Sequence, residues 1–168
     1  VYKRQPNECS KISLKNLNNE SRFFLLSQNI SMNKDQNLFL EKNFDDFSHN
    51  KNVEMISKNH FIISKNIKIT KNTHISKDFN FLIKEGVVLN IVKNSTLFIE
   101  GDIKFIGKDN NKIIIQSDGS GSLVFLNNKV EIKNMIVENL GYPKLNRYIL
   151  YGGLNFINTE LNLENISV

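Results

Sequence analysis

The sequence contains no tryptophan and no alanine, and only one cysteine and two prolines, among its 168 residues. A single cysteine cannot form a disulfide within the chain, so a disulfide-stabilised scaffold is excluded. No segment approaches the roughly 18 consecutive apolar residues that a membrane-spanning helix needs, so no membrane span is predicted. Alanine has the highest helix propensity of all residues. Its absence, together with abundant asparagine, isoleucine, lysine and phenylalanine, favours an all-β protein.

Residues 1–5, VYKRQ, are interpreted as a sequencing-adapter scar and not as part of the fold. They are encoded by GTG TAT AAG AGA CAG, a string that resembles the transposase end sequence used to tag sequencing libraries. A natural basic N-terminus is the alternative. On the first interpretation we expect a metagenomic fragment, and the lack of a signal peptide then carries no information about localisation.

The excess of positive charge is weak evidence for a nucleic-acid partner. The chain has 22 lysines and arginines against 17 aspartates and glutamates, but only Arg4, Arg22 and Arg147 are arginine. Nucleic-acid binding is better indicated by clustered arginines with interleaved aromatic residues. We therefore predict no nucleic-acid partner.

The pattern of the chain changes near residue 60. Residues 6–58 are predicted to be an irregular covering or linker segment, in which short apolar runs are separated by polar stretches. Residues 59–168 contain many short β-branched runs, among them FII, IKI, FLI, TLFI, IKFI, KIII and SLVFL. The breaks between these runs are rich in asparagine, glycine and aspartate, which are turn residues. Such a pattern is typical of a sandwich, a barrel or a coil of parallel strands.

An internal repeat favours the coil of parallel strands. Gly121–Val137 aligns without a gap with Gly152–Val168 at an offset of 31 residues, with six identities and four conservative matches over 17 positions. In a parallel β-helix, equivalent strands stack on one another and asparagines at a bend can form ladders of side-chain amides. Asn134 and Asn165 are the candidates for such a ladder, and the alternative is that each is an ordinary turn asparagine.

The segment before the repeat resembles the coils of a known superfamily, at Ile83, Gly86, Val88, Leu97, Ile99, Gly101, Ile103, Phe105, Gly107, Ile113, Ile115 and Ser117. This spacing of apolar residues and glycines is similar to that of the bacterial right-handed parallel β-helix (pectate-lyase-like) proteins. The resemblance implies an all-β, right-handed, single-stranded parallel β-helix over residues 59–168. We expect about four coils, incomplete at the C-terminus, with residues 6–58 covering the N-terminal end. It also implies an exported bacterial protein, at the cell surface or extracellular.

Enzymes of this superfamily hold Ca²⁺ with clustered carboxylates or use two or three close aspartates, and the coil region lacks both patterns. Glu131 aligns with Asn162 and Glu164 aligns with Lys133, so no acidic ladder climbs the repeat. The three histidines, His49, His60 and His74, have no zinc-ligand spacing and no carboxylate arranged with them. We therefore predict no catalytic residue, no metal site and no cofactor within the chain.

The segment Leu140–Gly152 holds three of the four tyrosines and is predicted to be a loop extruded from one bend. Aromatic rings and nearby polar groups on a loop are a common way to hold a sugar, so Tyr142, Arg147, Tyr148 and Tyr151 are the predicted carbohydrate-binding residues. The alternative is that the tyrosines pack the loop onto the coil.

The predicted function is a non-catalytic exported scaffold that binds a polysaccharide or presents adjoining domains of the same polypeptide. Two alternatives remain open. The chain could contribute the N-terminal coils of a polysaccharide lyase or glycoside hydrolase, or it could be a self-associating surface adhesin, which exposed coil ends would favour.

Overall fold

The computed structural model describes residues 45–47, 50–142 and 152–168. In these ranges the chain forms β-strands, mostly three to five residues long, and no α-helix. The strands are β1 (Asp45–Asp46), β2 (Val53–Ser57), β3 (His60–Ile63), β4 (Ile67–Ile69), β5 (Thr73–Ile75), β6 (Asn80–Lys84), β7 (Val88–Ile91), β8 (Thr96–Ile99), β9 (Ile103–Ile106), β10 (Ile113–Ser117), β11 (Ser122–Leu126), β12 (Lys129–Glu138), β13 (Leu154–Ile157) and β14 (Glu160–Ser167).

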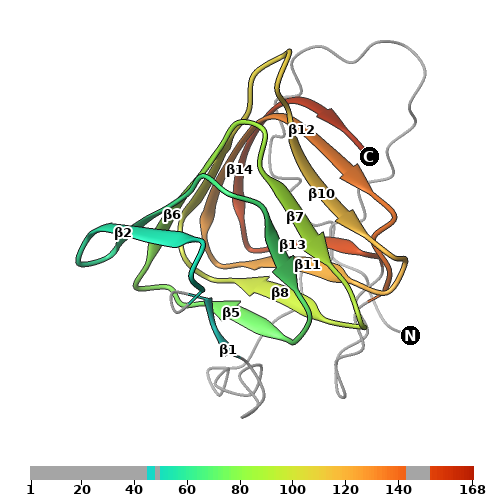
Figure 1. Cartoon of the computed structure of the whole chain (residues 1–168), viewed down its shortest axis with the longest axis horizontal. Helices are drawn as coiled ribbons and strands as arrows, with labels where there is room; N and C mark the ends of the chain where they lie inside the picture. The colour runs from blue at the N-terminus through green and yellow to red at the C-terminus, as the bar shows by residue number, and fades with distance from the viewer. Residues whose placement is uncertain (1–44, 48–49, 143–151) are drawn as a thin grey trace, which may run out of the picture.

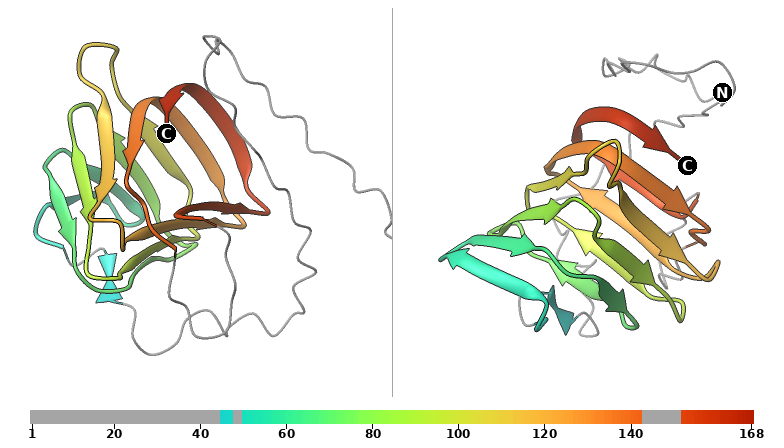
Figure 2. Two further views of the ribbon diagram at one scale, coloured as in Figure 1. Left: turned by 90° about the vertical axis from the view of Figure 1, so that its right-hand side faces the viewer. Right: turned by 45° about the horizontal axis from the view of Figure 1, so that its top comes forward.

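The strands stack into two sheets that are almost entirely parallel. One sheet has the order β1-β5-β8-β11-β13, and the other contains nine strands in the order β2-β3-β6-β9-β12-β10-β7-β4, with β14 also paired to β12. The chain therefore passes through the same positions in each turn: β3, β4 and β5 form one coil, β6, β7 and β8 the next, and β9, β10 and β11 the third. The coils lie behind one another in Figure 1 and are seen from the side in Figure 2. The predicted all-β, β-helix-like fold is confirmed.

The larger sheet is bent into two arms, and β12 runs through both of them. Residues from Val130 to Lys133 pair with β9 in the first arm, whereas Met135 to Glu138 pair with β10 in the second. Between them lies Asn134, whose φ of 52° is left-handed. Asparagine adopts this conformation more readily than most residues because its short side chain can bond locally. The bend therefore falls at Asn134.

The 31-residue repeat predicted from the sequence is confirmed by the strand register. Leu123 pairs with Leu154 and Phe125 with Phe156, while Val130 pairs with Leu161. The length of one turn is not constant along the chain. One turn is shorter in the N-terminal coils, as the pairing of Phe61 with Phe81 shows. It is longer in the C-terminal coils, where Phe125 pairs with Phe156, because the segments between the strands are longer there.

The core lies inside the coils, and in several strands it follows from the alternation of side chains between the two faces. In β9, for example, Ile103 and Phe105 are buried whereas Lys104 is exposed. Rings stack from coil to coil: the centroids of Phe61 and Phe81 lie 4.9 Å apart, and those of Phe125 and Phe156 also lie 4.9 Å apart. The inward side chains thus form one continuous apolar column.

The two ends of the column differ. At the N-terminal end, β2 pairs antiparallel with β3 and β1 pairs with β5, while the buried ring of Phe47 lies 5.5 Å from that of Phe81. At the C-terminal end, β14 pairs with β12, and no described strand pairs with its other edge. Most of residues 6–58 lie outside the described residues, so the covering role of that whole segment stays a prediction.

Candidate functional site

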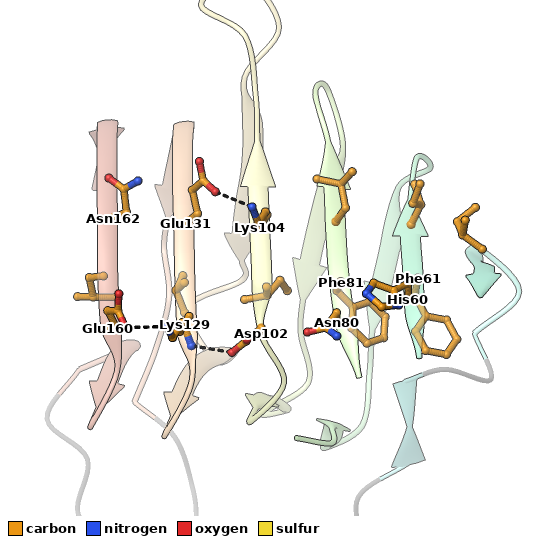
Figure 3. Close-up of a pocket in the computed structure, with 16 residues that line it drawn as sticks. His60, Phe61, Asn80, Phe81, Asp102, Lys104, Lys129, Glu131, Glu160 and Asn162 are labelled. Atoms are coloured by element: carbon orange, nitrogen blue, oxygen red, sulfur yellow. Dashed lines mark hydrogen bonds and ion pairs between the residues drawn. The ribbon is translucent and has the colours of Figure 1, made fainter. Parts of the chain in front are cut away.

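An open groove of about 600 Å³ crosses the outer face of the first arm of the larger sheet. Five parallel strands, β3, β6, β9, β12 and β14, form its floor, and β2 lies at one end. Side chains from neighbouring strands point into it in two rows, as Figure 3 shows. The polar and outward-facing residues that line it are Ile56, His60, Ile62, Asn80, Leu82, Asp102, Lys104, Lys129, Glu131, Glu160 and Asn162.

One row follows directly from the parallel register. Leu82 lies opposite Lys104, Lys104 opposite Glu131, and Glu131 opposite Asn162. The Nζ atom of Lys104 lies 3.1 Å from Oε2 of Glu131, and the Nζ atom of Lys133 lies 3.3 Å from Oε1 of the same carboxylate. Opposite charges on adjacent strands stabilise a sheet. Glu131 is therefore held from two sides.

The second row is built around Lys129. Its backbone N–H donates a hydrogen bond of 2.9 Å to Oδ1 of Asp102, and its Nζ atom lies 3.3 Å from Oε2 of Glu160. Both contacts join neighbouring coils. The charged side chains of the groove thus alternate in sign from strand to strand, and the cations that line it from β9 and β12 face carboxylates.

The electrostatics of the groove keep Glu131 ionised. The hydrogen bond from Lys104 is the largest effect and lowers the pKa of Glu131 below its ordinary value. Burial, the second-largest effect, raises this pKa, and the hydrogen bond from Lys133 and the charges of both lysines lower it further. A general acid in glycoside hydrolysis needs a raised pKa. The environment of Glu131 acts in the opposite direction.

The groove becomes more apolar toward the N-terminal coils. There its outward residues are the apolar Ile56, Ile62 and Leu82, with His60 and Asn80 beside them. Nδ1 of the exposed His60 lies 3.1 Å from Oγ of Ser57, within hydrogen-bonding distance. The groove therefore offers an apolar half and a half with paired charges.

The structure brings the two predicted ladder residues together at the bend of the larger sheet. The side-chain amide of Asn165 donates to Oδ1 of Asn134, and the amide of Asn134 donates a 3.1 Å hydrogen bond to the carbonyl of Gly107 in the preceding coil. A Cβ atom at Gly107 would lie 2.3 Å from the carbonyl oxygen of Asn134, so glycine allows this close approach.

A second asparagine contact was missed by the sequence analysis. The amide of Asn158 donates a 3.2 Å hydrogen bond to Oδ1 of Asn127, and both residues have left-handed φ values, of 48° and 51°. Beside them, Oγ1 of Thr159 donates a 3.1 Å hydrogen bond to Oδ1 of the buried Asn128. The identity of Asn127 and Asn158 in the 31-residue alignment was the signal that could have found this pair.

The expectation that no carboxylate accompanies the histidines is wrong for His74. Its Nε2 atom lies 2.9 Å from Oε2 of Glu100. The two residues are far apart in the sequence but lie in adjacent coils, because β5 pairs with β8. Stacking of the coils, which spacing along the chain does not reveal, creates the contact.

The predicted sugar-binding loop is only partly described. Tyr142 is 73% exposed and is not among the residues that line the groove. Arg147, Tyr148 and Tyr151 lie outside the described residues. Carbohydrate binding by these four residues therefore stays a prediction.

The described residues contain no group of three or more histidine, cysteine, aspartate or glutamate side chains placed to hold a metal ion. They also contain no helix that is long and apolar enough to cross a bilayer. Comparisons with protein-family models, with curated proteins and with solved structures give no match. The groove and its residues are therefore the basis for a functional proposal.

Proposed function

We propose that this chain is a non-catalytic β-helix scaffold of an exported protein, and that it binds an uncharged polysaccharide strand along the groove. The observation that carries this proposal is the open groove across five parallel strands, whose outer face is lined by side chains in register. A rigid, repetitive surface suits a repetitive ligand, because equivalent side chains recur at the strand spacing of about 4.8 Å.

The pairing of charges favours an uncharged ligand. Lys104 and Lys129 face the carboxylates of Glu131 and Glu160. A polyanion would have to compete with these carboxylates, which lie in the same groove and would repel it. The apolar surface of Ile62 and Leu82, with the amide of Asn80 on the strand of Leu82 and the amide of Asn162 on β14, instead suits the apolar faces and hydroxyl groups of a neutral sugar.

Binding is a better account of the groove than catalysis. The lowered pKa of Glu131 leaves this carboxylate as a hydrogen-bond acceptor rather than a proton donor near neutral pH. Glu131 is therefore not a candidate for the general acid of a glycoside hydrolase.

The test is a titration of the ¹⁵N-labelled full chain with neutral oligosaccharides of β-linked glucose, mannose or xylose, and with oligogalacturonate as the anionic comparison. We expect chemical-shift changes in β6, β9, β12 and β14 with a neutral ligand. Replacement of the exposed Asn162 by alanine should weaken binding several-fold. The matched control is Asn110→Ala, since Asn110 is also exposed but does not line the groove.

Three results would count against the proposal. The first is binding of no neutral oligosaccharide in the panel, and the second is tighter binding of oligogalacturonate than of any neutral ligand. The third is binding lost in Tyr142→Ala but retained in Asn162→Ala, which would move the site from the groove to the loop after β12.

A further inference from the structure

The hairpin formed by β2 and β3 exposes two large apolar side chains next to each other. Met55 and Ile56 of β2 are 67% and 61% exposed, although Met55 pairs with the buried Phe61. The register of the hairpin shifts between Met55 and Ser57, so β2 contains a bulge at this point. The hairpin projects from the side of the coil column in Figure 1. Exposed apolar side chains gathered at one place indicate a contact surface.

The same hairpin is rich in exposed lysine. Lys51 lies just before β2, Lys58 lies in the turn between the two strands, and Lys65 follows β3. Lys68 is exposed in the middle of the next strand, β4. Because β2 and β3 are antiparallel, Lys51 and Lys65 lie at one end of the hairpin and Lys58 at the other. The exposed apolar side chains of β2 are therefore flanked by positive charge.

These lysines differ from those of the later coils in their surroundings. In the later coils, lysines pair with glutamates, as Lys104 does with Glu131. Among the described residues, no ion pair joins a lysine of residues 50–69 to a carboxylate. Residues 50–69 contain four lysines and one glutamate, whereas residues 152–168 contain two glutamates and no lysine. The positive charge of the hairpin is thus available to an anionic partner.

We propose that the β2–β3 hairpin, together with Lys68, is a docking surface for an anionic lipid bilayer, and that Met55 and Ile56 enter its headgroup region. Lysines near an anionic leaflet are attracted by its surface charge. Exposed apolar side chains gain from burial at the boundary between headgroups and acyl chains. The proposal does not depend on sugar binding. Ile56 also lines one end of the groove, so the variants below leave it unchanged.

Protection of a sheet edge explains only part of this surface. Lysines on an edge strand discourage pairing with another chain, and β4 is an edge strand among the described residues. Protection of this kind does not require Met55 and Ile56 to be exposed. A soluble anionic polymer would contact the lysines and leave both apolar side chains in water. A bilayer accommodates the charges and the apolar side chains together, and it is therefore the occupant that the hairpin fits best.

The first experiment is co-sedimentation of the full chain with vesicles of phosphatidylcholine alone or of phosphatidylcholine mixed with phosphatidylglycerol. We expect binding to the mixed vesicles only, and release at high salt. Lys58→Gln/Lys65→Gln should weaken binding about thirty-fold, because each lysine contributes about five-fold near an anionic surface. The matched control, Lys93→Gln/Lys112→Gln, removes the same charge from bends of later coils and should weaken binding by no more than about two-fold.

The second experiment uses the absence of tryptophan from the chain, which makes a single introduced tryptophan a clean reporter. The emission of Met55→Trp should shift to shorter wavelength when mixed vesicles are added. The emission of Asn110→Trp, at an exposed position between β9 and β10, should not shift. Unchanged circular dichroism would show that each variant is folded.

Three results would overturn the proposal. Equal binding to both kinds of vesicle would show that the lysines have no part in it, and so would equal losses in the two double variants. An unshifted emission of vesicle-bound Met55→Trp would show adsorption through charge alone, as expected for a surface that binds a soluble anionic polymer. A shift at Asn110→Trp without one at Met55→Trp would place the contact on another face of the molecule.

Discussion

The two ends of the coil column are built from the same kind of strand but are finished differently. At the N-terminal end, β2 reverses direction against β3, β1 pairs with β5, and Phe47 fills the core beneath Phe81. At the C-terminal end, β14 leaves one edge without a described partner, and its inward leucines are only partly buried. The difference shows that inward side chains are buried where a described element covers the coil, as at the N-terminal end, and only partly buried where none does.

The comparison also separates the roles of equivalent residues. Phe125 and Phe156 stack on each other with their rings 4.9 Å apart and occupy the same position in successive coils. Phe125 is buried, but Phe156 is only partly buried because it lies in the last coil. Position along the column, and not residue type, therefore decides how much each side chain stabilises the fold.

The largest expected loss of stability comes from a substitution in the apolar core. Phe125→Ala should lower the free energy of unfolding by about 3–5 kcal/mol, because it leaves a cavity between two coils. Phe156→Ala should cost about 1–2 kcal/mol, since part of the ring is already exposed. Urea denaturation followed by circular dichroism would measure both. Equal losses for the two variants would show that the terminal coil is covered in solution.

Removal of the N-terminal closure should come next. Phe47→Ala should lower the free energy of unfolding by roughly 2–3 kcal/mol, because the buried ring packs against Phe81 at the end of the core. Hydrogen exchange should accelerate in β3 and β5 and remain slow in β11 and β12. Uniform acceleration across all coils would argue against Phe47 as a local closure.

Substitution of the asparagines at the bend should lower the stability by a smaller amount. Two substitutions at Asn134 can separate the contribution of its left-handed φ from that of its hydrogen bonds. Asn134→Ala should cost about 2 kcal/mol, since alanine disfavours the left-handed φ and removes the ladder hydrogen bonds. Asn134→Gly should cost about 1 kcal/mol, because glycine tolerates this φ and only the hydrogen bonds are lost. The same pair at Asn165, in the terminal coil, should cost less at each step. Thermal melts would rank the four variants.

The smallest effect concerns the charges of the groove. The pKa of Glu131 is lower in the folded chain than its ordinary value of 4.5, with the hydrogen bond from Lys104 as the main cause. Its contribution to stability is therefore complete above pH 4.5 and is lost as the pH falls through the lowered pKa.

Melting temperatures between pH 7 and pH 3 would detect this loss, and Glu131→Gln should flatten that part of the profile. The control is Glu138→Gln, since Glu138 is exposed at the end of β12. If both variants followed the unmodified chain down to pH 3, Glu131 would have no part in the acid response. Added salt should reduce the effect, because the ion pairs are partly exposed.

Much of the fold could be predicted from particular residues. IKFI was predicted as one of the short β-branched runs, and it forms β9, in which Ile103 and Phe105 are buried. The 31-residue alignment correctly predicted that Phe125 lies beside Phe156. Less of the candidate site could be predicted. Lys104 pairs with Glu131, but the spacing of these two residues in the sequence differs from the 31 residues of the repeat. No single period relates the residues of the groove.

The sequence by itself determined the all-β class, the short strands of the coils and the stacking of the last two coils. These features depend on short β-branched runs between turn residues and on one internal repeat without a gap, and both are local or periodic properties of the chain. Only the tertiary structure decided the antiparallel closure by β2, the contact of His74 with Glu100 and the rows of paired charges in the groove. The physical reason is that turns of unequal length set which residues of successive coils become neighbours, and strand pairing in three dimensions fixes that register.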